Sequence, residues 1–320
     1  MMIKSKQPNT LTGVTHTSGA FSTARILEIE RFAIHDGPGI RTIIFFQGCP
    51  LHCPWCANPE SQVNSNQLLH VSKNCINCGH CVSICPQNRI SFENNRPHFN
   101  QHFCEECRIC VNECPQNALQ IAGRTIFVEE IMKTILRDTD YYHNSGGGVT
   151  FSGGEALMQI ECLSALLQEC KTAGIHTAVE TSGHIPQEYI ETALPNVDLF
   201  LFDIKHLDAT KLKEVTGGNL SLILHNLAII TKDSARKVVL RVPCIPDFNL
   251  NDEFMDNLFK LALAHGITRI DLLSYHTLGR DKYAQLDRKY NYSHAPLEKS
   301  MLVTHLQRGQ ELGFDIRIEN

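Results

Sequence analysis

The 320-residue sequence contains no apolar run of the roughly 18 residues that a membrane-spanning helix requires. Basic residues are not in excess, because 29 lysines and arginines stand against 34 aspartates and glutamates, and the net charge is -5. Residues 1–24 are polar and lack the apolar core of a secretion signal, so they are predicted to form a flexible leader. We therefore expect a cytoplasmic protein that binds neither membrane nor nucleic acid.

Cysteine is unusually abundant in the sequence. Eleven of the 14 cysteines lie between residues 49 and 114. In a chain without a secretion signal, metal binding explains such a density better than a disulfide framework does. The remaining three, Cys162, Cys170 and Cys244, match no ligand spacing and are predicted to be buried core residues.

Outside the cysteine-rich segment, short apolar runs alternate with amphipathic helical patterns. The expected strands cover residues 41–47, 149–151, 176–180, 198–203, 237–242 and 269–273. The expected helices between them cover residues 156–172, 219–230 and 252–265. This alternation is typical of parallel strands joined by helical crossovers. It predicts an α/β domain of residues 25–65 and 123–320, interrupted by an insert over residues 66–122, and six units fit either an incomplete barrel or an open sheet.

Unusual polar residues follow these strands. They are Cys49 after the first strand, Gly153, Gly154 and Glu155 after the second, Glu180 and Thr181 at the third, and Asp203, Lys205, Arg241 and His276 at the last three. The carboxyl ends of parallel strands lie along one edge of a sheet, where α/β proteins bind their ligands. We therefore expect these side chains to meet in one cavity.

The first cysteine motif consists of Cys49, Cys53 and Cys56, with the spacing C-x3-C-x2-C. Three thiolates leave one iron of a [4Fe–4S] cubane open, whereas an electron-transfer cluster usually has four cysteine ligands. An open iron can bind a substrate. The alternative is a zinc site that takes His52 as its fourth ligand. However, His52 adjoins Cys53, and adjacent side chains rarely point at the same metal.

The insert carries a second motif in two copies. Each copy reads C-x2-C-x2-C-x3-C-P, which is typical of paired [4Fe–4S] clusters in which the fourth cysteine ligates the other cluster. One cluster is therefore assigned to Cys75, Cys78, Cys81 and Cys114, and the other to Cys104, Cys107, Cys110 and Cys85. The insert has few large apolar residues, so we expect it to fold around its clusters. The clusters either conduct electrons or serve only the structure, and the residues leave both open.

The motif of Cys49, Cys53 and Cys56, with Trp55 before its last cysteine, resembles that of the radical S-adenosylmethionine (SAM) superfamily. The segment 32–42 contains HDGPGIRT and resembles the signature of the enzymes that activate glycyl radical enzymes, as does the segment 55–61. The similarity extends from about Arg25 to the C-terminus. It implies a partial (β/α)6 barrel with an inserted ferredoxin-like domain. It also implies an oxidoreductase in which SAM chelates the open iron, is cleaved to methionine and a 5′-deoxyadenosyl radical, and so takes a hydrogen from a glycine Cα of a partner.

The resemblance also implies roles for individual residues. The expected SAM contacts are Trp55, Cys56, Ala57, Gly153, Gly154, Glu155, Asp203, Ile204, Lys205, Arg241 and His276. Glu180 and Thr181 are expected to line the SAM-binding site or to hold a cation near SAM. The residues expected near the partner's glycine loop are Asp36, Gly37, Pro38 and Arg41. Ser274 stands where the family motif around His276 has proline.

The implied partners are a glycyl radical enzyme as protein substrate and a ferredoxin or flavodoxin as electron donor, in an anaerobic setting. The first candidate substrate is choline trimethylamine-lyase, followed by a glycerol or propanediol dehydratase, an arylacetate decarboxylase or a formate-lyase-like protein. Two alternatives stay open: a radical SAM enzyme that acts on a small molecule or RNA, and a non-enzymatic electron carrier. The HDGPGIRT segment argues against the first. The three-cysteine motif argues against the second.

Overall fold

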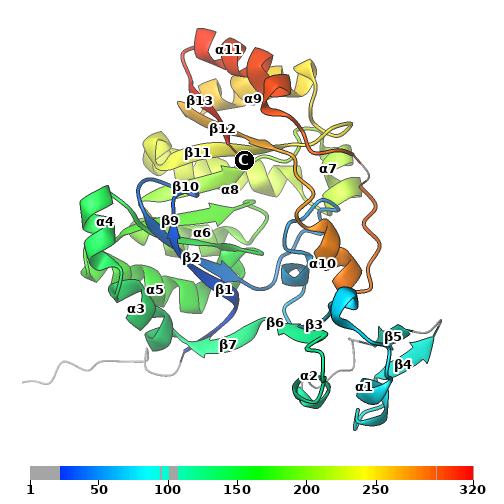
Figure 1. Cartoon of the computed structure of the whole chain (residues 1–320). Helices are drawn as coiled ribbons and strands as arrows, with labels where there is room; N and C mark the ends of the chain where they lie inside the picture. Colours follow the sequence, from blue (N-terminus) through cyan, green and yellow to red (C-terminus); the bar gives the residue numbers. More distant parts are fainter. Residues whose placement is uncertain (1–21, 94–95, 101–106, 293, 320) are drawn as a thin grey trace, which may run out of the picture.

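A computed structural model of the chain describes residues 22–93, 96–100, 107–292 and 294–319. Its main element is a nine-stranded sheet with the strand order β13-β12-β11-β10-β9-β8-β2-β1-β7 (Figure 1). All neighbouring strands from β13 to β2 are parallel. The predicted α/β class with a mostly parallel sheet is therefore confirmed.

The six strands expected from the sequence all lie in the parallel part of the sheet. They are β2 (Arg41–Phe46), β8 (Gly148–Gly153), β9 (His176–Thr181), β10 (Leu199–Asp203), β11 (Val238–Cys244) and β12 (Arg269–Ser274). A seventh parallel strand, β13 (Asp315–Glu319), pairs with β12 and has no counterpart in the sequence prediction. Its residues alternate between charged side chains and isoleucine, which is the pattern of a half-buried strand.

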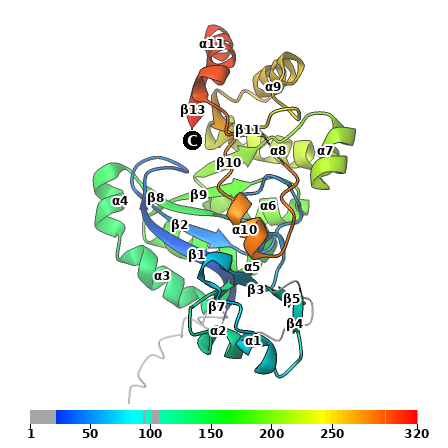
Figure 2. The same ribbon diagram turned by 45° about the vertical axis from the view of Figure 1, so that its right-hand side comes forward.

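Helices cover the outer face of the parallel strands (Figures 1 and 2). The principal ones are α3 (Val128–Leu136), α4 (Thr139–Ser145), α5 (Ile160–Thr172), α6 (Gln187–Ala193), α7 (Ala209–Thr216), α8 (Leu220–Ser234), α9 (Asp252–Ala264) and α11 (Val303–Glu311). The short helix α10 (Arg280–Gln285) lies instead against the loop that follows β2. Asparagine caps start two of the expected helices, because Asn219 and Asn251 accept hydrogen bonds from the N–H groups of Leu222 and Phe254. The apolar helix faces and the outward strand residues form one continuous core.

Two antiparallel strands extend the sheet beyond β2. β1 (Thr23–Ala33) pairs with β2, and β7 (Arg124–Phe127) pairs with β1. Ala24 and Ile26 are fully buried, so the chain belongs to the core from the start of β1. The predicted leader therefore ends slightly earlier than residue 24, and residues 1–21 of it lie outside the described part of the chain.

The sheet curves into an incomplete barrel. The loop of residues 34–38, which precedes β2, lines the same cavity as Arg317 and Glu319 of β13, although these strands are at opposite sides of the parallel sheet. Within the described residues the outermost strands β13 and β7 do not pair, so the barrel is not closed. A small apolar cluster fills the inner face below the polar strand ends; its members are Ala178, Leu199, Leu201 and Val239.

The cysteine-rich insert leaves the barrel through a two-stranded antiparallel ladder. Its short elements are β3 (Gln67–His70), α1 (His80–Ser83), β4 (Ile90–Glu93), β5 (Arg96–Phe99), α2 (Ile109–Asn112) and β6 (Leu119–Ala122), of which β3 pairs with β6 and β4 with β5. Asp287, which follows α10, contacts Arg96 at 3.1 Å and His98 at 2.9 Å and ties the second hairpin to the barrel. In both views the insert lies at the bottom of the molecule (Figures 1 and 2). No helix in the described ranges is long and apolar enough to cross a membrane.

Candidate functional site

A cavity of about 250 Å³ lies at the carboxyl ends of the parallel strands, and we call it the cysteine cavity. Cys49, Cys53 and Cys56 line it from the loop that follows β2. The other predicted site residues that line it are Trp55, Ala57, Gly153, Gly154, Glu180, Thr181, Asp203, Lys205 and His276. The structure thus brings together side chains that are up to 227 positions apart in the sequence (from Cys49 to His276).

The loop that carries the three cysteines is held in place by hydrogen bonds from α10 and from its own far end. The Tyr283 hydroxyl and the Gln62 amide both donate to the carbonyl of Cys53 at 3.1 Å. Lys282 forms an ion pair with the buried Glu60 at 2.7 Å and also donates to the side chain of Asn58. The cysteine positions are therefore set by the protein itself.

Burial raises the pKa of all three thiols, that of Cys56 to about 12. Free thiols in this cavity are protonated at neutral pH, and binding to iron displaces their protons. Each ligand cysteine of a cubane binds a different iron, so a cluster takes its thiolates from separate positions along the loop.

Gly153 and Gly154 lie where the end of β8 contacts the strand and loop around β2. A Cβ atom on Gly153 would lie 2.3 Å from the carbonyl oxygen of Phe46, and one on Gly154 would lie 2.3 Å from that of Gly48. Gly153 also has a φ of +109°, which side-chain-bearing residues rarely adopt. Only glycine therefore permits this approach, which brings the β8 backbone to the wall of the cysteine cavity.

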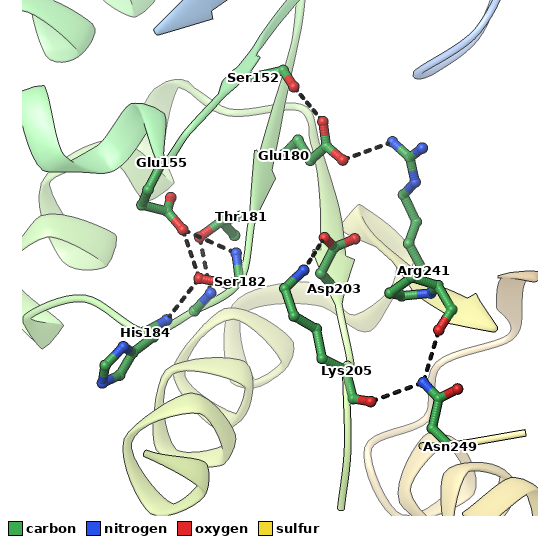
Figure 3. Close-up of polar contacts among 12 residues, drawn as sticks. Ser152, Glu155, Glu180, Thr181, Ser182, His184, Asp203, Lys205, Arg241 and Asn249 are labelled. Carbon is green, nitrogen blue, oxygen red and sulfur yellow. Dashed lines mark hydrogen bonds and ion pairs between the residues drawn. The ribbon is translucent and has the colours of Figure 1, made fainter. Parts of the chain in front are cut away.

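Glu155 is almost completely buried, at 1% exposure, and does not itself line the cavity. One carboxylate oxygen accepts hydrogen bonds from the N–H and hydroxyl of Ser182 at 3.0 and 2.8 Å (Figure 3). The other oxygen, Oε1, has no hydrogen-bond partner among the described residues. Burial raises the pKa of this carboxyl group, and the Ser182 hydrogen bonds oppose that effect. Glu155 thus joins the ends of β8 and β9 and keeps one acceptor atom free.

Asp203 and Lys205 form an ion pair at 2.7 Å after β10, with side-chain exposures of 15% and 14% (Figure 3). Burial alone would lower the pKa of Lys205, but the charge of Asp203 raises it well above its usual range. Asp203 Oδ1 is buried and has no hydrogen-bond partner in the described part of the chain. Ile204, between them, packs in the hydrophobic core and does not line the cavity. Its predicted contact with SAM is therefore limited to its backbone.

Arg241 does not line the cysteine cavity itself but an adjoining cavity that shares Trp55, Glu180 and His276 with it. Its guanidinium lies 2.7 Å from Asp36 and 3.3 Å from Glu180, and Ser152 donates a hydrogen bond to the same Glu180 carboxylate (Figure 3). Burial raises the pKa of Glu180 to about 7, although Arg241 opposes the shift. This network joins the 34–38 loop to β9 and β11. A direct contact of Arg241 with SAM stays a prediction.

Arg41 is fully buried and supports the 34–38 loop from below. It donates to Thr150 Oγ1 at 2.6 Å, to the carbonyl of Pro38 at 3.0 Å and to the carbonyl of Val149 at 2.5 Å. Burial lowers the pKa of its guanidinium to about 10. Asp36, Gly37 and Pro38 line a neighbouring cavity, so they are open to a ligand. Arg41 holds that loop and is itself shielded from solvent, so any role it has near the partner's glycine loop, which stays a prediction, is indirect.

The insert contains two further cavities lined by cysteines. Cys75, Cys78, Cys81 and Cys114 line the first. Cys85, Cys107 and Cys110 line the second, and Cys104 lies outside the described residues. Each cavity thus combines cysteines from both copies of the motif. This is the crossed grouping that the spacing predicts, in which the last cysteine of each copy joins the other set.

The comparisons with known proteins agree with this geometry. Residues 43–259 match the profile described as the radical SAM superfamily. The chain belongs to the radical SAM superfamily. The choline trimethylamine-lyase activating enzyme of Oleidesulfovibrio alaskensis is 41% identical and aligns over 83% of this chain and 88% of its own length. The (2S)-3-sulfopropanediol sulfolyase activating enzyme of Bilophila wadsworthia is 40% identical over 84% of this chain and 90% of its own.

A solved radical SAM methyltransferase from Sphaerobacter thermophilus shares the fold, with a TM-score of 0.52 at 11% identity over 87% of this chain and 66% of that one. Several relatives in the superfamily are named as activating enzymes, and they activate different targets at similar identity. The radical SAM chain is an activating enzyme of a glycyl radical enzyme. It therefore uses SAM and a [4Fe–4S] cluster.

The unpartnered atoms at the strand ends fit these ligands. Glu155 Oε1 and Asp203 Oδ1 are buried acceptors in need of a donor, and an isolated buried carboxylate oxygen is costly. The ammonium group of SAM would supply such a donor to Asp203, whose side chain lines the cavity. His276, whose pKa is lowered by burial, lines the same cavity as a neutral ring. The residues present therefore fit the cofactor that the family implies.

Sequence reasoning missed several residues that build the site. The fully buried Asn249 donates to the carbonyls of Lys205 at 2.8 Å and Pro243 at 2.7 Å (Figure 3). Lys282 and Tyr283 brace the cysteine loop from 222 and 230 positions away. None of the three belongs to a motif with a recognisable spacing. Only the three-dimensional contacts reveal them.

Proposed function

We propose that the cysteine cavity holds one [4Fe–4S] cluster together with SAM, and that Cys49, Cys53 and Cys56 are the cluster's ligands. The observation that carries this proposal is the cavity itself, where three cysteines on one loop face polar residues from several strand ends. When bound there, cluster and SAM supply a 5′-deoxyadenosyl radical that takes a hydrogen atom from a glycine Cα of the partner. The protein binds and orients the reactants and keeps water out.

Individual residues have distinct tasks in this proposal. The backbone of Gly153 and Gly154 approaches the SAM amino group, and Asp203 Oδ1 accepts its hydrogen bonds. Glu155 supports this wall from behind, through its hydrogen bonds with Ser182. Lys205 balances the charge of Asp203 and donates to the SAM carboxylate. The remaining proposed contacts are Trp55, Ala57, the Ile204 backbone, Thr181 and His276. Glu180, with Thr181, lines the same wall and provides negative charge for a cation beside SAM.

We further propose that the insert holds two [4Fe–4S] clusters that pass electrons to the cysteine cavity. The crossed grouping of cysteines around two separate cavities supports two clusters. Asp287 connects the β4–β5 hairpin to α10, and α10 in turn braces the cysteine loop, so the insert has a fixed place beside the barrel. The electron donor is a ferredoxin or flavodoxin, and the setting is an anaerobic cytoplasm.

The protein substrate proposed first is choline trimethylamine-lyase. The 41% identity to an activator of that lyase supports it. The benzylsuccinate synthase activating enzyme of Thauera aromatica is also 41% identical, so identity alone does not choose between targets. A dehydratase, a decarboxylase or a formate-lyase-like protein are the other candidates, and each is tested in the same assay.

The test is carried out without oxygen. The protein is reconstituted with iron and sulfide, reduced, and mixed with SAM and each candidate partner in turn. We expect a doublet radical in the electron paramagnetic resonance spectrum of one partner, and we expect none with Cys53→Ala. Cys170→Ala, which removes a buried thiol that lines no cysteine cavity, is the matched control and should still give the signal. SAM cleavage without a radical on any candidate would contradict the proposal.

A further inference from the structure

The insert repeats one sequence pattern, so its two copies can be compared position by position. Cys85 and Cys114 end the two copies, and the Sγ atom of each accepts a hydrogen bond of 3.3 Å from the backbone N–H four residues later. Ile90 and Leu119, each five residues after that cysteine, are both buried. Leu119 lines the cavity with four cysteines, which we call the first insert cavity, and Ile90 lines the other, the second insert cavity. The two cavities are thus built from matching positions.

A position before the cysteines differs in its chemistry between the copies. His70 lies five residues before Cys75, and Phe99 lies five residues before Cys104. His70 lines the first insert cavity but not the second, and Phe99 lines the second but not the first. The two rings contact each other, with 5.5 Å between their centroids. The first insert cavity therefore has an imidazole where the second has an apolar ring.

The His70 side chain is almost completely buried, at 8% exposure. It ends β3, a strand whose four residues are all buried, and it lies opposite Leu119 of β6. Its Nδ1 atom is 3.5 Å from the Ser72 hydroxyl. Its other nitrogen, Nε2, is buried and has no hydrogen-bond partner in the part of the chain that the structure describes. Because a buried polar atom without a partner is costly, Nε2 marks a place for a group that this cavity binds.

The chemistry of the first insert cavity decides which role Nε2 can have. Cys75, Cys78, Cys81 and Cys114 already form the complete ligand set of a cubane, so His70 is not needed as a ligand of iron. The sulfur atoms of such a cluster accept hydrogen bonds, which help to set its reduction potential. A neutral imidazole has one N–H donor and one acceptor nitrogen. With the proton on Nε2, the ring donates to a sulfur atom, and Nδ1 can accept from the Ser72 hydroxyl.

We propose that His70 Nε2 donates a hydrogen bond to a sulfur atom of the cluster in the first insert cavity and thereby raises the reduction potential of that cluster. The inference rests on the proposed function, because it takes the insert clusters as present. Reduction adds one electron from the ferredoxin or flavodoxin, and no covalent bond is formed or broken. The added negative charge strengthens the hydrogen bond, so the bond favours the reduced state. His70 thus acts on electron uptake through the cluster.

The test is a redox titration of the reconstituted full chain without oxygen, followed by electron paramagnetic resonance. All variants also carry Cys53→Ala, so that the barrel cluster does not contribute and the two insert clusters are observed. His70→Leu has a side chain of similar size without an N–H group, and we expect the midpoint potential of one insert cluster to fall. At a fixed potential, its ratio of oxidised to reduced cluster should rise at least about threefold, which is about 28 mV for a one-electron couple. The other midpoint should stay unchanged.

Two further variants separate the hydrogen bond from packing. His70→Gln keeps an N–H donor and should restore most of the lost potential. Phe99→Leu is the matched control, because it removes the ring at the equivalent position and its contact with His70 but no N–H group. It should leave both midpoints unchanged. Each cluster is compared with itself, because Arg89 lines the second insert cavity where Ala118 lines the first.

The inference is overturned if neither midpoint moves in His70→Leu, if both fall equally, or if His70→Gln falls as far as His70→Leu does. A check without any His70 variant is pulsed electron paramagnetic resonance of the chain labelled with ¹⁵N-histidine. It should detect a weak nitrogen coupling to an insert cluster, and absence of the coupling also overturns the inference.

Iron analysis of the Cys53→Ala protein distinguishes failure of this inference from failure of the proposed function. About eight irons per chain together with unmoved midpoints would refute only the role of His70. A chain that binds no iron in the insert would refute the proposed insert clusters, and the role of His70 with them.

Discussion

The barrel and the insert hold their cysteines in different ways. In the barrel, the cysteine loop packs on a continuous apolar core and is fixed by hydrogen bonds from Tyr283 and Gln62. In the insert, α1 and α2 have four residues each and contain no buried residue, and Cys78 and Cys107 are exposed. A single helical turn is not stable alone. The barrel is thus built by packing, whereas the insert depends on what its cysteines bind.

The largest effect is expected from Cys53→Ala in the barrel. It removes a proposed cluster ligand, so we expect SAM cleavage to be abolished, while the barrel fold and the two proposed insert clusters persist. Iron analysis should show a fall from about twelve to about eight irons per chain. Loss of all iron would mean that the barrel, too, depends on its cluster, and the contrast between the two regions would disappear.

The second largest effect is expected from removal of iron by a chelator, which should affect the insert and the barrel differently. The insert is expected to lose its protection from hydrogen exchange, because its few buried apolar side chains cannot hold it without clusters. The barrel helices α5, α8 and α9 should keep theirs, because they rest on the apolar core. Mass spectrometry of peptides from each region measures the hydrogen exchange. An equal loss of protection in both regions would contradict the expected difference.

Lys205→Met tests how strongly the barrel site depends on its buried charges. The change leaves Asp203 without its partner at 15% exposure, so we expect a loss of about 3 kcal/mol in the free energy of unfolding and weaker SAM binding. Lys171→Met breaks the exposed pair with Asp198 and should cost less than about 1 kcal/mol. Denaturant titration of both variants measures the difference. Equal losses in the two variants would show that the buried pair contributes no more to the free energy of unfolding than the exposed pair does.

The pKa of Glu180 predicts a pH dependence that belongs to the barrel alone. Its pKa is raised from 4.5 to about 7, so the folded protein holds this proton more tightly than the unfolded chain does. The resulting stability is complete below the unfolded value and is lost as the pH rises through about 7. Glu180→Gln should therefore show a smaller fall in stability between about pH 5.5 and about pH 7.5. An unchanged slope would mean that Glu180 is ionised throughout.

The smallest effect is expected from Asp287→Asn, at the contact between the two regions. The Asp287 side chain is 40% exposed and that of Arg96 is 57% exposed, and such pairs contribute less than about 1 kcal/mol. Stability should hardly change, and the insert should keep its hydrogen-exchange protection. Release of the insert would show that this contact, and not the β3–β6 ladder, positions it.

Local patterns explain which features the sequence could predict. Six of the seven parallel strands are short apolar runs between amphipathic helices, and the cysteine sets follow from spacing alone, so both are visible along the chain. β1, β7 and β13 lie at or near the edges of the sheet, where fewer residues are buried and the apolar signal is weaker.

Local sequence patterns could not predict which residues Arg241 contacts. Its partner Asp36 is 205 positions away, and only the curvature of the sheet brings the two together. Residue type can thus nominate members of the site, but their pairing is a property of the folded barrel.

Deuterium transfer from the partner tests the central claim most directly. The partner is prepared with its glycine residues deuterated at Cα and is mixed without oxygen with the reduced protein and SAM. The mass of the 5′-deoxyadenosine is then measured by mass spectrometry. Hydrogen abstraction from glycine predicts one deuterium in this product, and none with Cys53→Ala. Unlabelled 5′-deoxyadenosine, formed beside an activated partner, would contradict the account.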